Sequence, residues 1–211
     1  MTTEVEERGR ARIPDDARAL DHWVFGPLTV TAHDTLEPVY EESYWRLYEG
    51  AFGPLRTEAA ARQVLDRDEF SEEMTDPRVT KYLVWDDDGA AGMTTLTQDL
   101  STVPWISPHF YAARYPDHAA RDAIFYLGFI LVRPGLRSSR VFHRLMDVVT
   151  DRISAADGVV GYDICAFNIT TLNFADRIET VVGRRHPAAF AEVDSQHYFT
   201  TDFLVAGPPA D

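Results

Sequence analysis

The stretch Ile124–Met146 reads IFYLGFILVRPGLRSSRVFHRLM, and it decides the fold expected for the whole chain. It begins with an unbroken apolar run, Ile124–Val132, whose β-branched and aromatic side chains are typical of a strand buried on both faces. Pro134 and Gly135 favour a turn that ends this strand. After the turn, apolar residues recur at spacings of three and four and predict an amphipathic helix, namely Val141, Leu145, Val148, Val149 and Ile153.

The turn between this strand and this helix is rich in serine and arginine. A helix that begins directly after a strand directs backbone N–H groups and the positive end of its dipole towards the turn, and such turns bind anions. Within a chain of net charge −14, a local basic cluster indicates a small anionic ligand, and the cluster consists of Arg133, Arg137, Arg140 and Arg144. The alternative is that these arginines face solvent and pair with surface carboxylates.

The composition is that of a globular protein. The 211 residues are 45% hydrophobic and 12% aromatic, which suffices for a large core. We expect a loose N-terminal extension over residues 1–22, a single domain over 23–205 and a frayed tail over 206–211. No apolar window has the length of a membrane span, and the charged N-terminus lacks the pattern of a secretory signal. We therefore expect a cytoplasmic protein with no membrane partner.

The net charge and the cysteine content exclude some classes of partner and of metal site. The net charge of −14 argues against nucleic acid as a partner, because phosphate binding needs clustered cations. The single cysteine, Cys165, excludes an internal disulfide framework and a zinc site built on several thiolates, and we expect no metal. Of the 20 basic residues, one is a lysine, Lys81, and the others are arginines.

Periodicity and turn residues predict the elements on either side of the central stretch. Before it we expect a strand over 23–31 interrupted at Gly26-Pro27, a helix from Asp34 or Thr35 to Gly50 or Gly53, a helix over about 57–73, a strand over 79–85, a hairpin turn at 86–89, a strand over about 90–100 and an irregular aromatic segment over 101–121. After it we expect a strand over 159–167, a helix over 170–182 and a last strand over 197–205. This order implies a mixed sheet with helices on both faces.

The order of elements and the central stretch resemble the GNAT-type N-acetyltransferases. In that family a turn of the pattern V-x-P-x-x-R/Q-G-x-G-x-G/A joins a strand to a helix and holds the pyrophosphate of acetyl-CoA. Val132, Pro134 and Arg137 match this pattern, whereas its three glycine positions hold Ser138, Arg140 and Phe142. The resemblance implies an α/β (α+β) fold with a mixed, mostly antiparallel central sheet flanked by helices on both faces.

The resemblance also implies acetyl-CoA, or another acyl-CoA, as co-substrate. In the family, a β-bulge in the central strand lets neighbouring backbone groups pair with the pantetheine arm. The Arg140 guanidinium could replace glycine backbone contacts with a bidentate contact to phosphate. Asn168 fits the asparagine that commonly follows the family's fifth strand. The residues expected to bind the co-substrate are therefore Ile130, Leu131, Val132, Arg137, Ser138, Ser139, Arg140, Val141, Phe142 and Asn168.

The implied activity is transfer of an acetyl group from acetyl-CoA to an amine of a small molecule or peptide, by direct attack in a ternary complex. This chemistry needs a base for the ammonium proton and an N–H donor for the carbonyl oxygen, which the strand backbone over 129–131 could supply. Many family members carry a tyrosine as general acid, and that position holds Ala175 here. Our catalytic candidates are Tyr126 and His109, with His118, Asp122 and Asp163 as alternatives.

The acceptor is constrained only by charge and by one aromatic segment. The negative net charge favours a cationic amine, and residues 105–115 offer an apolar wall. Homodimers are frequent among proteins with this resemblance, so a homodimer is one expected form. Two alternatives to acyl transfer stay open: binding of a ligand or partner chain without catalysis, or another reaction on a CoA- or carrier-bound substrate.

Overall fold

A computed structural model describes residues 19–135 and 140–202 of the chain. Its centre is a six-stranded sheet in the order β1-β2-β3-β4-β5-β6. Neighbouring strands are antiparallel except β5 and β6, which are parallel. The strands are β1 (Asp21–Phe25), β2 (Leu28–His33), β3 (Val79–Asp86), β4 (Gly89–Thr97), β5 (Ile124–Val132) and β6 (Val159–Gly161). The mixed, mostly antiparallel sheet predicted from the sequence is confirmed.

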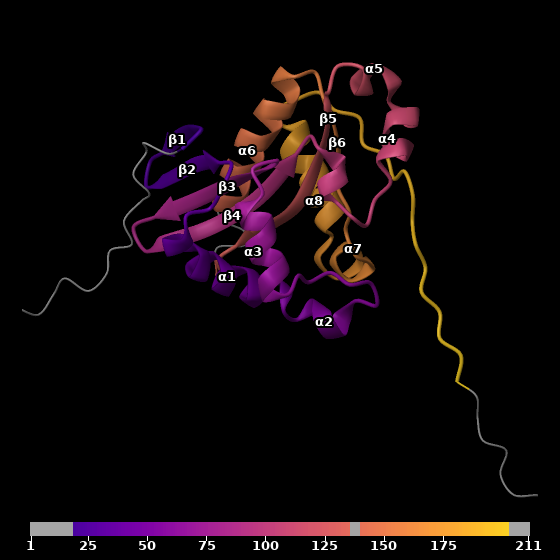
Figure 1. Cartoon of the computed structure of the whole chain (residues 1–211), viewed down its shortest axis with the longest axis horizontal. Coiled ribbons are helices and arrows are strands. Elements are labelled where there is room, and N and C mark those ends of the chain that lie inside the picture. Colours follow the sequence, from indigo (N-terminus) through magenta and orange to yellow (C-terminus); the bar gives the residue numbers. More distant parts are fainter. Residues whose placement is uncertain (1–18, 136–139, 203–211) are drawn as a thin grey trace, which may run out of the picture.

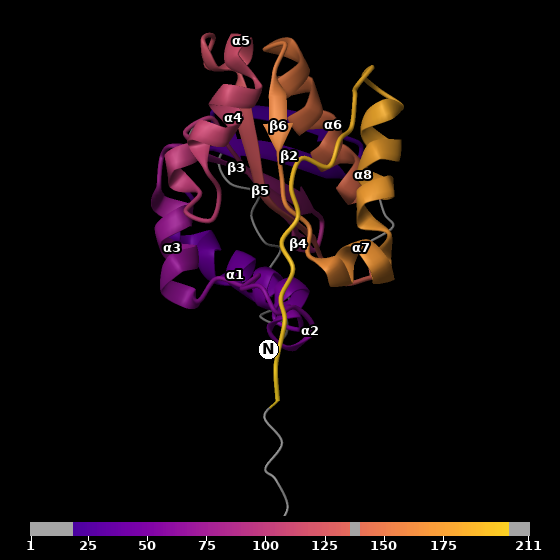
Figure 2. The same ribbon diagram turned by 90° about the vertical axis from the view of Figure 1, so that its right-hand side faces the viewer.

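Helices flank the sheet on both faces, as predicted (Figure 1). In Figure 2, α1 (Pro38–Phe52) and α3 (Arg67–Thr75) lie to one side of the strands, and α6 (Arg140–Ala155) and α8 (Phe174–Gly183) lie to the other. The shorter helices are α2 (Leu55–Glu58), α4 (Pro108–Arg114), α5 (Pro116–Ala119) and α7 (Ala166–Leu172), and a 3-10 turn, η2, covers Leu100–Thr102. The predicted arrangement of a central sheet between two helical layers is therefore the observed one.

Each face of the sheet has its own core. The stripe predicted for the central helix is buried in α6 and packs on β2–β5, together with Ile178 of α8. On the opposite face, α1 and α3 bury Tyr44, Tyr48 and Phe70 against Trp85 of β3. β5 lies between the two cores and is buried as predicted, except at residues 128–130, which are half-exposed.

Local turn and cap geometry corrects the predicted elements before β3. The strand expected over 23–31 is a hairpin of β1 and β2, because Gly26 adopts a φ of 66° in the turn between them. The helix expected from Asp34 or Thr35 begins at Pro38. The helix expected over 57–73 is split into α2 and α3, because the Asp66 side chain accepts hydrogen bonds from two backbone N–H groups and starts α3 with a capping box.

The chain also departs from prediction on both sides of the central stretch. The segment 101–121, expected to be irregular, contains α4 and α5, each with a proline in its first turn. The strand expected over 159–167 ends at Gly161, and Asn168 lies within α7 rather than directly after a strand. Asn173, in the left-handed conformation with φ 50°, divides the helix expected over 170–182 into α7 and α8.

The last predicted strand is wrong over the residues that the structure describes. Residues 197–202 have no strand partner in the described chain, and 203–205 lie outside the described residues. β1 begins at Asp21, while the N-terminal residues 1–18 and the predicted tail 206–211 also lie outside the described part. The side chain of Phe199 is 90% exposed, so alternation of polar and apolar residues alone did not place this segment in the sheet.

Candidate functional site

A β-bulge in β5 is the centre of the candidate site. Residues 127–130 of β5 lie opposite residues 94–96 of β4, so β5 carries one extra residue at this point. The Thr94 Oγ1 donates a hydrogen bond of 2.6 Å to the carbonyl oxygen of Phe129, which satisfies a backbone acceptor at the bulge. The structure thus contains the bulge that the family resemblance implied for the central strand, with its extra residue just before Ile130.

β5 and β6 stay paired only before the bulge. Residues 124–126 of β5 pair with residues 159–161 of β6, and within the described chain no strand pairs with this edge of β5 beyond residue 126. A strand edge without a partner presents backbone N–H and C=O groups that an extended ligand can pair with. The edge over 127–132 is therefore a candidate binding edge, and the predicted residues Ile130, Leu131 and Val132 lie on it.

A small cavity of about 20 Å³ lies beside the bulge. A volume of this size holds about one water molecule. Its lining combines polar and aromatic side chains from α3, β4, β5 and the segment before α4, among them Glu73, Thr95, Thr97, Trp105, Tyr126 and Gly128. The cavity places a carboxyl group, three threonine side chains and two aromatic side chains around the point where β5 separates from β6.

Glu73 of α3 directs its carboxyl group to the bulge. A Cβ atom added to Gly128 would lie 3.6 Å from the Glu73 Oε1. Burial raises the pKa of Glu73, and this effect exceeds the lowering by the Thr95 hydroxyl and by the charge of Lys81. The Thr95 Oγ1 is buried and makes no hydrogen bond of ordinary geometry within the described residues. A carboxyl group with a raised pKa is suited to accept a proton near neutral pH.

Tyr126, a predicted catalytic residue, lies on β5 and lines the same cavity. Its hydroxyl group donates a hydrogen bond of 2.5 Å to the Oδ1 of Asp163, and the Trp105 Nε1 donates to the same oxygen over 3.1 Å. Burial and Asp163 raise the pKa of Tyr126 far above its ordinary value, so its hydroxyl group stays protonated. The structure therefore joins two of the predicted candidates, Tyr126 and Asp163, in one hydrogen-bonded pair.

The other catalytic candidates lie away from this pair. His109 is exposed on α4, and α4 reaches Tyr126 through Tyr111, whose ring packs edge-on with centroids 6.2 Å apart. His118 of α5 packs against Tyr115. Asp122 is exposed, with a φ of 52°, in the turn before β5. The catalytic role predicted for His109 stays a prediction.

The residues predicted to hold the pyrophosphate divide into three groups. Arg137, Ser138 and Ser139 lie outside the described residues. Arg140 is the exposed first residue of α6. The side chains of Val141 and Phe142 are buried, and the Phe142 ring packs on Phe174 of α8 with centroids 5.8 Å apart. The phenylalanine at the third glycine position thus contributes to the core.

Two of the clustered arginines form contacts within the fold. Arg133 donates to the Asp86 carboxylate over 2.7 Å and to the Ala90 carbonyl oxygen over 3.1 Å, which joins it to the β3–β4 hairpin. Arg144 donates to Asp147 over 2.8 Å, and its guanidinium lies 4.8 Å from the centre of the Phe25 ring. For these two residues the alternative of pairing with surface carboxylates is the observed arrangement.

Over residues 19–135 and 140–202, no group of three or more acidic, histidine or cysteine side chains is arranged to hold a metal ion. Within the same ranges, none of the helices combines the length and the apolar character that crossing a membrane requires. Cys165 is a half-buried free thiol that precedes α7.

Comparison with known proteins gives structural similarities only. No protein-family model matches the chain, and no curated protein matches its sequence. An aminoglycoside acetyltransferase from an uncultured soil metagenomic sample, crystallised with sisomicin, is 12% identical, with 83% of this chain and 97% of that chain covered and a TM-score of 0.48. The aminoglycoside antibiotic 6'-N-acetyltransferase AAC(6')-Ih from Acinetobacter baumannii is 13% identical, with coverage of 83% and 99% and a TM-score of 0.48. A ribosomal-protein-alanine N-acetyltransferase from Brucella melitensis biovar Abortus 2308 is 10% identical, with coverage of 81% and 99% and a TM-score of 0.47.

Proposed function

We propose that this chain is an acyl-CoA-dependent acyltransferase that transfers an acyl group, most simply acetyl, to an amine. The observation that carries the proposal is the juxtaposition of the β5 bulge, the edge over 127–132 that has no strand partner in the described chain, and the half-buried Glu73 carboxyl group. In this proposal acyl-CoA lies along the free edge of β5, with its phosphates at the start of α6. Arg140 and the predicted residues Arg137, Ser138 and Ser139 would contact the phosphates.

The proposed mechanism assigns one task to each group around the bulge. Acyl-CoA supplies the thioester carbonyl group as electrophile and the CoA thiolate as leaving group. The acceptor nitrogen forms a bond to the carbonyl carbon, the carbon–sulfur bond breaks, and the sulfur leaves with the electron pair. A backbone N–H at the bulge donates to the carbonyl oxygen, where negative charge develops. Glu73 accepts the proton that the nitrogen loses, directly or through one water molecule in the cavity.

The Tyr126–Asp163 pair borders the acceptor side of the site in this proposal. Because the Tyr126 hydroxyl is committed to Asp163 and its pKa is raised, we assign Tyr126 a positioning role rather than that of an acid for the thiolate. Asp163 is exposed and so offers a negative charge to a cationic acceptor. Trp105, which is 53% exposed, adds an aromatic surface next to that carboxylate.

Turnover tests the proposal directly. Purified protein is mixed with acetyl-CoA and a panel of amines, including diamines, amino sugars and short peptides, and free CoA thiol is followed with time. We expect amine-dependent release of CoA and an acetylated amine of the corresponding mass. The absence of release with acetyl-, propionyl- and malonyl-CoA across the panel, from a protein that is folded, would contradict the proposal.

Arg140→Ala should weaken acetyl-CoA binding, because the exposed arginine at the start of α6 is assigned to phosphate. We expect the Kd to rise about tenfold, equivalent to about 1.4 kcal/mol. Calorimetry of the parent and the variant measures the change. Arg121→Ala is the matched control, because Arg121 also lies exposed but contacts Ala156 and Asp157 away from the bulge. An unchanged Kd in Arg140→Ala would contradict the assignment of this arginine.

Gly128→Ala should reduce turnover, because the bulge has no room for a side chain facing β4. The added Cβ would lie 2.5 Å from the Thr95 Oγ1, so the hydroxyl group or the strand must shift. We expect kcat/KM to fall about tenfold or more, equivalent to about 1.4 kcal/mol of transition-state stabilisation. Gly183→Ala is the control, because a Cβ there would meet nothing within 4 Å. Equal kcat/KM values for Gly128→Ala and the parent would contradict the proposal that the bulge is part of the site.

A protein that binds its ligand without catalysis would give different results in these experiments. If the chain only binds a CoA-type ligand, acetyl-CoA raises its thermal stability, yet no amine in the panel releases CoA. The hydrogen bond from the Tyr126 hydroxyl group to Asp163 is the observation that favours this second candidate, because it leaves the departing thiolate without that tyrosine as an acid.

A further inference from the structure

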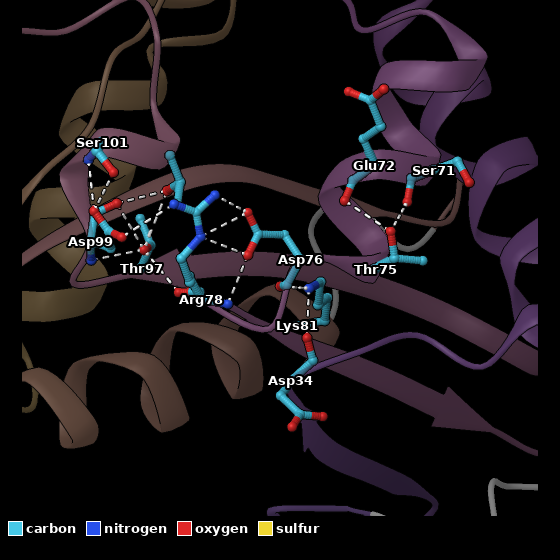
Figure 3. A network of polar contacts seen from close by, with 11 residues as sticks. Asp34, Ser71, Glu72, Thr75, Asp76, Arg78, Lys81, Thr97, Asp99 and Ser101 are labelled. Carbon is cyan, nitrogen blue, oxygen red and sulfur yellow. Dashed lines mark hydrogen bonds and ion pairs between the residues drawn. The ribbon is translucent and has the colours of Figure 1, made fainter.

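The only lysine of the chain is completely buried. Lys81 of β3 is 0% exposed, whereas every other basic residue in the chain is an arginine. Figure 3 shows its Nζ between two backbone carbonyl groups, those of Asp34 and Asp76, to which it donates over 2.8 Å and 2.6 Å. These carbonyl groups belong to the loop that leads to α1 and to the end of α3. An ammonium group has three N–H donors, and these two bonds use two of them.

Burial of an ammonium group is costly unless opposite charge lies nearby. Three carboxyl groups act on Lys81, those of Glu73, Asp76 and Asp34, and Glu73 has the largest effect. The Asp76 carboxylate already accepts a hydrogen bond of 2.6 Å from Arg78, and Asp34 is exposed to solvent. Glu73, which is half-buried on α3, is therefore the carboxyl group that most favours the protonated form of Lys81.

Lys81 also lies in a row of polar side chains that crosses the sheet towards the bulge. His33 of β2 pairs with Lys81, and Lys81 pairs with Thr95 of β4. These three side chains are 4%, 0% and 1% exposed. The His33 Nε2 has no hydrogen-bond partner within the described ranges, and the Thr95 hydroxyl group lowers the pKa of Glu73. Thr95 faces the bulge, where Glu73 lies, so the row ends at the proposed proton acceptor.

We propose that Lys81 is a positioning residue for Glu73, whose buried ammonium group keeps the Glu73 carboxyl group ionised and ready to accept a proton. This inference rests on the proposed function, in which Glu73 takes the proton of the acceptor amine. A lysine suits this position because its charge is compact, whereas the planar guanidinium of an arginine would need more room and five donors satisfied. Lys81 would thus act on the reaction only through Glu73.

Three further titratable groups near the pair, those of His33, Tyr48 and Asp76, are fixed in charge near neutral pH. Burial lowers the pKa of His33, and burial raises the pKa of Tyr48 of α1 to about 12, so both are neutral. The Arg78 guanidinium lowers the pKa of Asp76, which is therefore ionised. Burial lowers the pKa of Lys81 to about 8, so Lys81 is still mostly protonated at neutral pH. Lys81 is thus the positive charge that Glu73 experiences most strongly.

A single lysine makes this coupling directly measurable. In protein labelled with carbon-13 at lysine Cε, Lys81 gives one side-chain resonance whose shift reports its titration. Because Glu73 stabilises the protonated lysine, Glu73→Gln should move the titration midpoint of Lys81 down by about 1 pH unit. Glu72→Gln is the matched control, because Glu72 is the adjacent, exposed carboxylate of α3 and should leave the midpoint unchanged. Equal midpoints in the parent and Glu73→Gln would overturn the inference.

This titration needs no turnover, so it separates the inference from the proposed function. If acyl transfer is absent but the Lys81 midpoint responds to Glu73→Gln, the proposed function fails and the coupled pair remains. If acyl transfer is present, Lys81→Met should move the acidic limb of the kcat/KM profile to higher pH, because Glu73 then binds its proton more tightly. A lysine that only joined two loops would lower kcat/KM equally at all pH values, and that result would contradict a positioning role. Should Lys81→Met not fold, the lysine titration alone decides.

Discussion

Replacing Glu73 with glutamine should lower kcat/KM for acyl transfer about 10²- to 10⁴-fold, which is the usual contribution of a positioned general base. Glutamine has nearly the same shape, so it keeps the packing of α3 on the sheet. Its amide cannot accept the proton that the acceptor nitrogen loses. Steady-state release of CoA from acetyl-CoA, with the best amine of the panel, measures the effect.

Two further expected results distinguish the loss of a general base from a loss of acetyl-CoA binding. The Kd of acetyl-CoA should change little in Glu73→Gln, because the carboxyl group is assigned to the acceptor and not to the phosphates. The acidic limb of the kcat/KM profile should disappear, because it reports the ionisation of Glu73. Glu72→Gln should behave like the parent, since its carboxylate is exposed on the same helix. A Glu73→Gln variant as active as the parent would exclude Glu73 as the base.

Trp85→Ala should lower the free energy of unfolding by about 3–5 kcal/mol, the range found when a buried aromatic side chain is truncated. The Trp85 side chain is 1% exposed and joins α1 to β3. Its ring meets those of Tyr40 and Tyr44 edge-on, with centroids 5.1 Å and 5.2 Å apart. Its Nε1 donates a buried hydrogen bond of 3.1 Å to the Thr31 Oγ1. Denaturant unfolding followed by circular dichroism measures the loss.

The hydrogen bond and the packing of Trp85 can be measured apart. Thr31→Val leaves the ring in place and removes only its acceptor, so we expect a smaller loss of about 1–3 kcal/mol. Asp87→Ala, in the exposed β3–β4 turn, should change the free energy of unfolding by less than about 0.5 kcal/mol. A loss for Trp85→Ala no larger than that for Thr31→Val would mean that α1 is not held by this ring.

The elements around the central stretch could be predicted because their signals are local. The apolar run of β5 has the predicted bounds, and the spacing of apolar residues placed the stripe of α6. The β3–β4 hairpin followed from its Asp-Gly turn. Other boundaries depend on single residues that end or start an element only in a particular tertiary context. Gly26 turns the chain only because β1 returns along β2, and the Asp66 cap starts a helix only where its side chain is free to accept two N–H groups.

The backbone features of the site could be predicted from the sequence, but two of its charged side chains could not. The bulge in β5 was implied by the family resemblance, and the pairing of Tyr126 with Asp163 united two candidates that are far apart in sequence. Nothing in the sequence singled out Glu73 as a site residue, because a glutamate near the end of a helix is most often solvated. Only the packing of α3 over Thr95 and Gly128 makes it half-buried and raises its pKa. The same holds for Lys81, whose burial depends on pairing between β2, β3 and β4.

Calorimetric titration of the protein with acetyl-CoA tests the central claim, that the bulge and the free edge of β5 bind acyl-CoA. We expect saturable binding at one site in the parent protein, and much weaker binding in Gly128→Val, whose side chain would fill the space beside the Thr95 Oγ1. Binding should also raise the free energy of unfolding, by about 2.7 kcal/mol at one hundred times the Kd. No heat of binding and no stabilisation at millimolar acetyl-CoA would contradict the account.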